Sequence, residues 1–378
     1  VSSAVSTGGV CLSMPTVCVS TPTLPGASIS RALSERNWNR RATVSPLHHA
    51  ADDMSQIKDK TEGNRPAIEV VKPGWLTTVQ DLGRHGYQRY GMPVSGAMDR
   101  FAAIVGNRLV GNPDGTAVLE CTLKGPELLF RQDTYLALTG ADLSPTLDGS
   151  DIPGWECIAV RGGSRLRFGR RRAGFRCYVA IAGGFDVPVV LGSRSTHCPS
   201  QTGGLNGRPL QRGDLLFSGP RGGDAGRLVG RRLPARLLPQ YDRSVLLRVI
   251  LDPRREFFQE AAAATLTNSV YTIAPQSDRM GYRLRGPTIP RRDTTRFISE
   301  GTVTGALQVP ADGQPILLMA DRQTTGGYPS LAVVISADLP LAGQLGPGDS
   351  IRFAPCSLIE AQALLRTQWH LLEAALPT

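Results

Sequence analysis

The segment Asp-Arg-Gln-Thr-Thr-Gly-Gly-Tyr at residues 321–328 holds the densest group of reactive side chains in the sequence. It directly follows the apolar run 316–320, a pattern that predicts a polar loop at the end of a buried strand. Its paired glycines allow backbone N–H groups to face an anion or a polarised carbonyl group. The alternative is a hydrogen-bonded turn that closes a barrel. Eight consecutive polar or small residues beside a core strand favour function. The candidate catalytic residues here are Asp321 and Gln323, and the candidate substrate-binding residues are Thr324, Thr325, Gly326, Gly327 and Tyr328.

Charged residues also fall in three other predicted loops. Arg279, within residues 277–283, can bind a substrate carboxylate through two parallel hydrogen bonds and is the third candidate catalytic residue. Asp99 lies near the start of a predicted helix, where backbone N–H groups attract anions. Asp142 follows the apolar run 135–139. Each residue has a structural alternative, namely a surface ion pair for Arg279 and helix capping for the region of Asp99.

Several common classes of site are excluded by their missing motifs. The sequence has no phosphate-binding G-x-x-x-x-G-K-[ST], no dinucleotide-binding G-x-G-x-x-G and no G-x-S-x-G nucleophile elbow. Its five His residues and seven Cys residues show no metal-ligand spacing, so we predict no metal site. Unpaired cysteines indicate a reducing compartment, and no apolar run is long enough to cross a membrane, so we expect a cytoplasmic protein.

The net charge of +10 is concentrated in two stretches of the chain. Residues 161–176 contain seven Arg and no acid, and residues 221–236 contain five Arg and one Asp. Aromatic residues are sparse among these arginines, whereas nucleic-acid-binding surfaces interleave basic and aromatic side chains. We therefore expect a partner-facing surface or a neutral Arg-rich composition, and neither nucleic-acid nor membrane binding.

The elements that must position these loops are mostly strands. Apolar runs of four to seven residues alternate with Gly- and Pro-rich turns, which predicts a mainly β protein with sheets closed into barrels or sandwiches. Three helices are expected: one over residues 97–110 with Ser95 as its N-cap, and one that starts at Asp252-Pro253. The third opens with the capping box of Ser357 and Glu360 and continues through Leu372.

A weak internal repeat predicts two domains. The Gly-Asp turn at residues 213–214 and the Gly-Asp turn at residues 348–349 each precede a short strand that ends near a proline. We predict that each strand closes one barrel, with domains at residues 66–222 and 223–378, the second carrying the C-terminal helix. Residues 1–65 are expected to be a disordered leader or a wrongly assigned upstream region.

Taken together, these motifs resemble the allophanate-hydrolase-subunit-2-like proteins, also called the biotin-dependent carboxyltransferase family. That family includes the C subunit of bacterial 5-oxoprolinase and KipA. The similarity extends from about Ile68 to Phe353. The segments that carry it are residues 79–84, 91–99, 138–142, 182–184, 191–195, 277–282 and 321–328.

The resemblance implies two cyclophilin-like β-barrel domains and a pocket that the polar loops share. It adds Tyr282 to the candidate substrate-binding residues and assigns Asp99 and Asp142 to the same group. It also implies a complex with two further proteins, one KipI-like and one LamB/YcsF-like, which uses ATP to hydrolyse 5-oxoproline to glutamate. The ATP site is not assigned to this chain, which carries no covalently bound cofactor and no biotin-attachment motif.

Two alternative functions stay open. The chain can be the carboxyltransferase component of a biotin-dependent urea carboxylase or allophanate-type system, with biotin on another protein. It can also be a KipA-like binding protein that antagonises a kinase inhibitor. Our main prediction is a hydrolase component that acts on a small cyclic amide and is active only within a complex.

Overall fold

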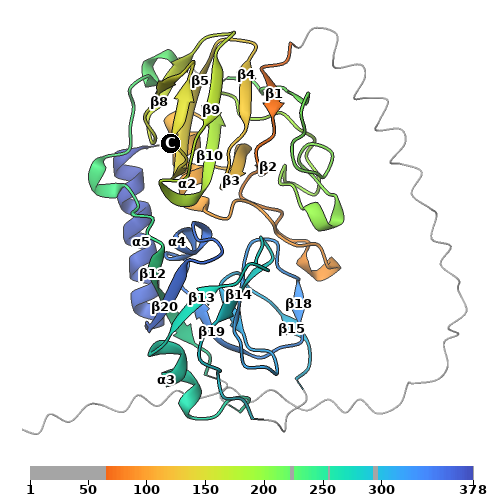
Figure 1. The fold of residues 1–378 in the computed structure, drawn as a ribbon, viewed down its shortest axis with the longest axis vertical. Coiled ribbons are helices and arrows are strands. Elements are labelled where there is room, and N and C mark those ends of the chain that lie inside the picture. The colour runs from red at the N-terminus through yellow and green to blue at the C-terminus, as the bar shows by residue number, and fades with distance from the viewer. Residues whose placement is uncertain (1–64, 222–224, 254–255, 293–296, 378) are drawn as a thin grey trace, which may run out of the picture. The chain divides into compact units, whose positions relative to one another are not determined.

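The computed structural model describes residues 65–221, 225–253, 256–292 and 297–377. Residues 1–64 of the predicted leader (1–65) therefore lie outside the described residues. Strands dominate the described chain, which confirms the mainly β prediction, and they form two lobes (Figure 1). The first lobe contains the strands from β1 to β11, and the second lobe contains those from β12 to β20.

The first lobe is built from two sheets that enclose one hydrophobic core. Residues from both sheets, such as Ile68, Leu128, Leu136 and Val179, pack together with their side chains fully buried. The six-stranded sheet has the order β11 (Leu215–Leu216), β1 (Ile68–Lys72), β4 (Glu127–Phe130), β9 (Arg165–Phe168), β6 (Pro145–Leu147), β7 (Ser150–Asp151). The five-stranded sheet has the order β2 (Leu76–Gln80), β3 (Val118–Thr122), β10 (Ala173–Ile181), β5 (Thr134–Asp142), β8 (Cys157–Val160).

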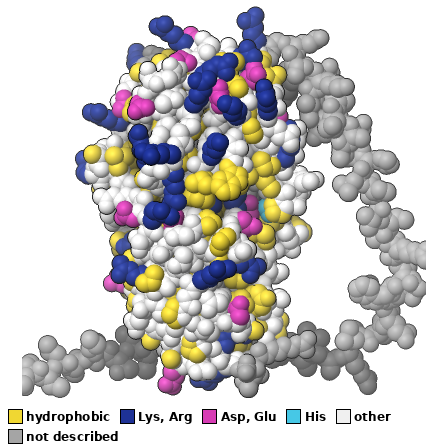
Figure 2. Space-filling view, viewed as in Figure 1, with side chains coloured by type: hydrophobic (Ala, Val, Ile, Leu, Met, Phe, Trp, Pro, Cys, Tyr) yellow, Lys and Arg dark blue, Asp and Glu magenta, His cyan; other side chains and the backbone are white. Residues whose placement is uncertain are grey.

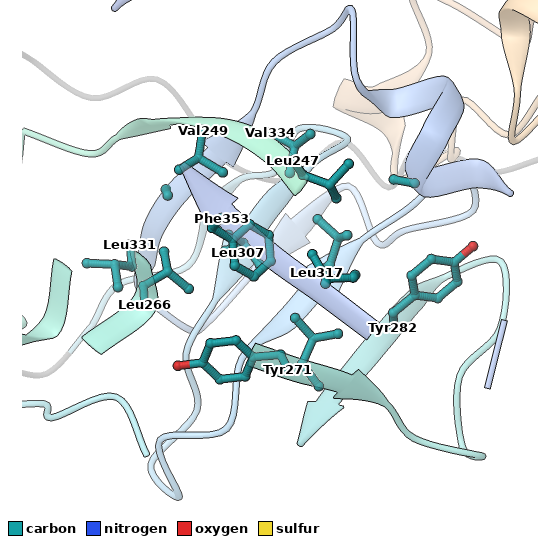
Figure 3. Packing of buried hydrophobic residues seen from close by; sticks show 14 of the residues in the cluster. Leu247, Val249, Leu266, Tyr271, Tyr282, Leu307, Leu317, Leu331, Val334 and Phe353 are labelled. Carbon is teal, nitrogen blue, oxygen red and sulfur yellow. The ribbon is translucent and has the colours of Figure 1, made fainter. Parts of the chain in front are cut away.

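The second lobe is a closed barrel of seven strands. Alternate residues of β12, namely Val245, Leu247 and Val249, point inward, as the period of two in a strand requires. They meet Leu307 and Phe353 in the barrel core (Figure 3). The order is β12 (Ser244–Leu251), β19 (Ser330–Val334), β16 (Ala306–Gln308), β17 (Ile316–Leu318), β14 (Gly281–Arg285), β13 (Val270–Ile273), β20 (Ser350–Pro355). A separate pair is β15 (Glu300–Gly301) with β18 (Thr325–Gly326).

Helices pack outside the sheets. The capping box of Ser357 and Glu360 is confirmed at the start of α5, which runs along both lobes (Figure 1). The α-helices are α2 (Arg100–Leu109), α3 (Ala261–Thr267), α4 (Leu339–Gly343) and α5 (Leu358–Ala375). The 3-10 helices are η1 (Gln88–Tyr90), η2 (Cys198–Ser200), η3 (Ala225–Leu228) and η4 (Ala235–Leu237). None of the helices in the described ranges is both long and apolar enough to cross a membrane.

Two predicted helix starts are wrong. Asp99, not Ser95, is the N-cap of α2, because its carboxylate accepts the Ala102 N–H at 2.8 Å. Ser95 instead adopts a positive φ of 57° and turns its hydroxyl group toward the second lobe. The helix predicted from Asp252 begins only at Ala261, with Glu260 before it.

The internal repeat corresponds to two equivalent turns. Gly213 and Gly348 both have positive φ, a conformation that glycine adopts without strain. The aspartate after each glycine accepts a backbone N–H three residues upstream. Asp214 also accepts a guanidinium group from Arg208, and Asp349 accepts those of Arg243 and of Arg171, which belongs to the first lobe. β11 then pairs with β1, whereas β20 closes the barrel between β12 and β13.

The arginine-rich stretch around β9 lies on the surface of the first lobe. Figure 2 shows basic side chains spread over that lobe, with acidic groups between them. Lys72, Arg165 and Arg167 converge on Glu127, and hydrogen bonding to Lys72 lowers the pKa of that carboxyl group to about 2, against the opposing effect of burial. Part of the local basicity is thus neutralised within the lobe.

Candidate functional site

Arg279 and Asp321 form a buried ion pair at one end of the barrel. Arg279 precedes β14 and Asp321 follows β17, and these strands are neighbours with Gly281 opposite Leu318. The guanidinium group donates two parallel hydrogen bonds, from Nε to Oδ2 at 2.9 Å and from Nη2 to Oδ1 at 3.0 Å. The two-pronged contact predicted for Arg279 therefore exists, but its acceptor is Asp321 of the same chain.

Residues of the first lobe form further hydrogen bonds to this ion pair. Arg279 also donates from Nη1 to Glu120 and, at 2.6 Å, from Nη2 to the Gly96 carbonyl oxygen. The Ser95 hydroxyl group donates to Asp321 Oδ1 at 2.7 Å. Burial alone lowers the pKa of Arg279, but the charges of Asp321 and Glu120 raise it above its ordinary value. We call these four side chains, Ser95, Glu120, Arg279 and Asp321, the ionic cluster; it joins the two lobes.

A chain of hydrogen bonds continues from the ionic cluster to Asp99. Glu120 accepts the Tyr178 hydroxyl group at 2.8 Å, and that hydroxyl oxygen accepts the Asp99 N–H at 2.7 Å. The Asp99 carboxylate then accepts the Tyr241 hydroxyl group and the Gln344 amide, both at 2.8 Å. Because its side-chain partners are neutral, burial raises the pKa of Asp99 to about 6, although these hydrogen bonds oppose the shift.

Tyr282 lies on the same seam between the lobes. It is buried, and its hydroxyl group accepts from Arg176 Nη1 at 3.0 Å and donates to the Leu345 carbonyl oxygen at 3.2 Å. Gln344 accepts the backbone N–H groups of Phe175 and Arg176 at 2.9 Å each. The phenol of Tyr282 is thus part of the contact between the lobes.

The rest of the 321–328 loop is tied to the barrel wall. The Gln323 amide donates to Gln308 Oε1 at 3.2 Å, and Gln308 donates to the Tyr328 carbonyl oxygen at 3.2 Å. Thr324 is half-buried, and Thr325, Gly327 and Tyr328 are exposed. Gly326 and Gly327 do not have a positive φ. Gly326 pairs with Glu300 in a short ladder and lies against Gln308, where a Cβ would overlap the amide.

Asp142 is a predicted site residue whose hydrogen bonds and ion pair within the described chain do not involve the ionic cluster. It ends β5, accepts the Ser144 N–H at 2.8 Å and lies 3.8 Å from Arg172 at the surface. Glu120, Tyr178 and Gln344 were missed as candidates. The sequence did contain a signal for Glu120. It is the only acid in the strand 118–122, all of which is buried, and a buried carboxylate requires a hydrogen-bonding or cationic partner.

A pocket of about 450 Å³ opens on the same seam, beside the ionic cluster. Its walls come from both lobes and from α5. The lining includes Ser95, Met98, Arg100, Arg322, Gln368 and Trp369. A concave site of this volume with apolar walls and a few polar groups is typical of small-molecule binding.

The ionic cluster and the neighbouring pocket have different properties. In the ionic cluster every charged group contacts a group of opposite charge. Arg279 and Asp321 therefore fix the position of the two lobes relative to each other. The pocket beside it is lined by hydroxyl, amide and guanidinium groups, which can bind a small polar molecule and polarise its carbonyl group. The catalytic roles assigned from sequence to Arg279, Asp321 and Gln323 stay predictions.

Comparison with known proteins places this geometry in a family. The model for "Carboxyltransferase domain, subdomain A and B" matches residues 90–355. The chain is 38% identical to the C subunit of 5-oxoprolinase from Escherichia coli over 307 residues, which is 81% of this chain and 96% of that protein. It is 35% identical to urea amidolyase of Saccharomyces cerevisiae over 320 residues, 80% of this chain but 17% of that protein.

Solved structures agree with these sequence relatives. The urea amidolyase of K. lactis matches with a TM-score of 0.78 and 33% identity over 88% of this chain, which spans about a fifth (21%) of that larger chain. The structure named TTHA0988 matches with a TM-score of 0.69 and 36% identity over 78% of this chain and 56% of its own. The resemblance read from the motifs is thereby confirmed: the chain belongs to the carboxyltransferase-domain family, with its subdomains A and B.

Proposed function

We propose that this protein is the C subunit of a 5-oxoprolinase, a hydrolase complex that opens the lactam ring of 5-oxoproline to give glutamate. The observation that carries the proposal is the 38% identity to a protein of that name over 96% of its length. A second protein of that name, from Haemophilus influenzae, is 37% identical over 94% of its length. The urea amidolyase of Saccharomyces cerevisiae, by contrast, matches this chain over only 17% of its own length.

The complex would supply what this chain lacks. A lactam carbonyl group is a weak electrophile, and ATP hydrolysis can drive its opening: water adds to the carbonyl carbon, the C–N bond breaks, and the nitrogen takes up a proton. Because the sequence has no phosphate-binding loop, we assign ATP to the assembly rather than to this chain. The expected partners are a KipI-like protein and a LamB/YcsF-like protein.

We place the substrate in the pocket beside the ionic cluster. Ser95 belongs to both, since its hydroxyl group donates to Asp321 and it lines the pocket. The cluster would keep the pocket walls from the two lobes at a fixed separation, which is the positioning that catalysis needs. Arg279, Asp321 and Ser95 thus act on the substrate through the geometry of the pocket.

Reconstitution tests the proposal. The chain is combined with candidate KipI-like and LamB/YcsF-like partners, and glutamate release from 5-oxoproline is measured with and without ATP. We expect release that requires ATP and stops when this chain is omitted. Gln323→Ala tests the predicted catalytic amide, and Gln362→Ala, at an exposed position of α5, is its control. Full glutamate release without this chain would refute the proposal, and an unchanged rate for Gln323→Ala would remove Gln323 from the mechanism.

A carboxyltransferase function is the second candidate, favoured by the family description and by 35% identity to urea amidolyase. Because the chain has no biotin-attachment motif, biotin would arrive on another protein. Transfer of labelled carboxyl from a carboxybiotin carrier to urea, with no release of glutamate from 5-oxoproline, would select this function over the first.

A further inference from the structure

Arg322 differs electrostatically from the other buried arginines of the described residues. Its side chain is 6% exposed, Nη1 donates to the Thr304 hydroxyl group at 2.7 Å, and Nη2 reaches the Thr302 carbonyl oxygen only at 3.5 Å. Nε has no acceptor. Burial lowers the pKa of Arg322, and no acidic neighbour raises it. The guanidinium group therefore carries a buried charge without a counter-ion.

The other buried arginines make this contrast specific. Arg279 pairs with Asp321 and Glu120, and Arg108 pairs with Asp114 and Glu373. The remaining two also lie near acids: Arg84 near Asp81 and Asp321, and Arg176 near Glu120. Among the described buried arginines, an acid is missing only at Arg322. An unpaired buried cation is costly, so a partner from outside the chain is expected.

The pocket beside the ionic cluster supplies the space for that partner. Arg322 lines it, and so does Arg100, an exposed residue whose pKa is lowered by desolvation against the opposing charge of Asp81. No Asp or Glu lines the pocket, so its two guanidinium groups make it cationic. Met98 and Trp369 add apolar surface. A small anion with a carbon body matches this lining, and the planar guanidinium fork favours a carboxylate.

We infer that the pocket binds the carboxylate group of its small ligand, with Arg322 as the buried counter-ion and Arg100 at the rim. The inference deepens the proposed function and rests on it for the identity of the ligand, 5-oxoproline. It transfers to Arg322 the carboxylate-binding role that the sequence suggested for Arg279, whose donors are occupied by Asp321, Glu120 and Gly96.

Calorimetric titration of the full chain tests the inference with two probes. One is 5-oxoproline, and the other is 2-pyrrolidinone, which has the same lactam ring without the carboxylate. We expect Arg322→Gln to weaken binding of 5-oxoproline by about tenfold or more, as loss of a hydrogen-bonded charge does. Arg100→Gln, at the exposed rim, should weaken it by about two- to fivefold. Arg352→Gln, on the outer face of β20, is the control and should change nothing.

Binding of 2-pyrrolidinone should be weak and equal in wild type and Arg322→Gln. Equal affinity of these two proteins for 5-oxoproline overturns the inference, as does equally tight binding of both probes. If Arg322→Gln does not fold, Arg322→Lys and Arg100→Gln carry the same comparison. If the chain alone binds neither probe, the KM of the reconstituted complex decides: a KM unchanged by Arg322→Lys and Arg100→Gln refutes the inference while the proposed function stands. Arg322-dependent binding of acetate without any turnover of 5-oxoproline supports the carboxylate site and refutes the function.

Discussion

Replacing Arg279 with Met should destabilise the protein strongly, because this side chain links the two lobes. Methionine fills much of the same volume but removes four hydrogen bonds: two to Asp321, one to Glu120 and one to the Gly96 carbonyl oxygen. It also removes the only guanidinium group that is hydrogen-bonded to the buried carboxylates of Glu120 and Asp321 in the described chain, and leaves Glu120 at 3.8 Å from Arg176. Arg279, Glu120 and Asp321 are each less than 10% exposed, so water cannot take over the lost contacts.

The magnitude follows from the number of stranded groups. Breaking a buried ion pair by removal of one partner costs about 3–5 kcal/mol, most of it from the charge left behind. Arg279→Met removes the cation that two buried carboxylates share, and the remaining arginines offset only part of this loss, so we expect about 3–5 kcal/mol, a large share of the total stability of a domain. Protonation of a carboxyl group removes its uncompensated charge, so the stability deficit of the variant should shrink as the pH falls.

Urea denaturation followed by tryptophan fluorescence measures the free energy of unfolding at pH 7.5 and pH 5. The triple variant Arg279→Met, Glu120→Gln, Asp321→Asn should recover part of the loss, because it removes the stranded charges. Arg352→Met, at an exposed position, should change stability by less than about 0.5 kcal/mol. A loss below about 1 kcal/mol for Arg279→Met, or a triple variant no better than the single one, would refute the description of this cluster as a buried ionic bridge.

Three further changes test neighbouring features by urea denaturation. The pKa of Asp99 in the folded protein is about 6, above its ordinary value. The free energy of unfolding of wild type should therefore rise by about 1 kcal/mol relative to Asp99→Asn as the pH falls from 7 to 5, and no rise would show that this pKa is not raised. Ser95→Ala should cost about 1.5–3 kcal/mol through the lost bond to Asp321, whereas a neutral result would show that this bond adds nothing. Gly326→Ala should cost about 1–3 kcal/mol because its Cβ overlaps Gln308, while Gly327→Ala, whose Cβ would make only an ordinary contact, should be almost neutral; equal effects would contradict the packing.

Much of the fold follows from local patterns. The apolar run 135–139 lies within β5, and the capping box at Ser357 marks the start of α5, because hydrophobic patterning and capping act within a few residues. The wrong N-cap at Ser95 has a non-local cause. Its hydroxyl group bonds Asp321, which is 226 positions away, and that bond outweighs the local preference for capping.

The site was predictable in part for the same reason. Arg279 and Asp321 stand out in sequence because charged residues beside apolar strands need partners, and the barrel register brings them together. Sequence could not reveal which partners they take, since Glu120 and Ser95 come from the other lobe. Nor could it reveal the wall that α5 adds to the pocket, because Gln368 and Trp369 continue an ordinary amphipathic helix.

Asp321 and Arg322 are consecutive residues with opposite electrostatic situations, and this contrast is the strongest argument for a functional seam. The carboxylate of Asp321 is held by Arg279 and Ser95, whereas the guanidinium group of Arg322 has no acid within the described chain. If the segment served only to join the lobes, the unpaired charge of Arg322 would destabilise the contact between them without serving any purpose. An incoming carboxylate would remove that cost, so a chain that is incomplete electrostatically on its own would become complete when its ligand binds.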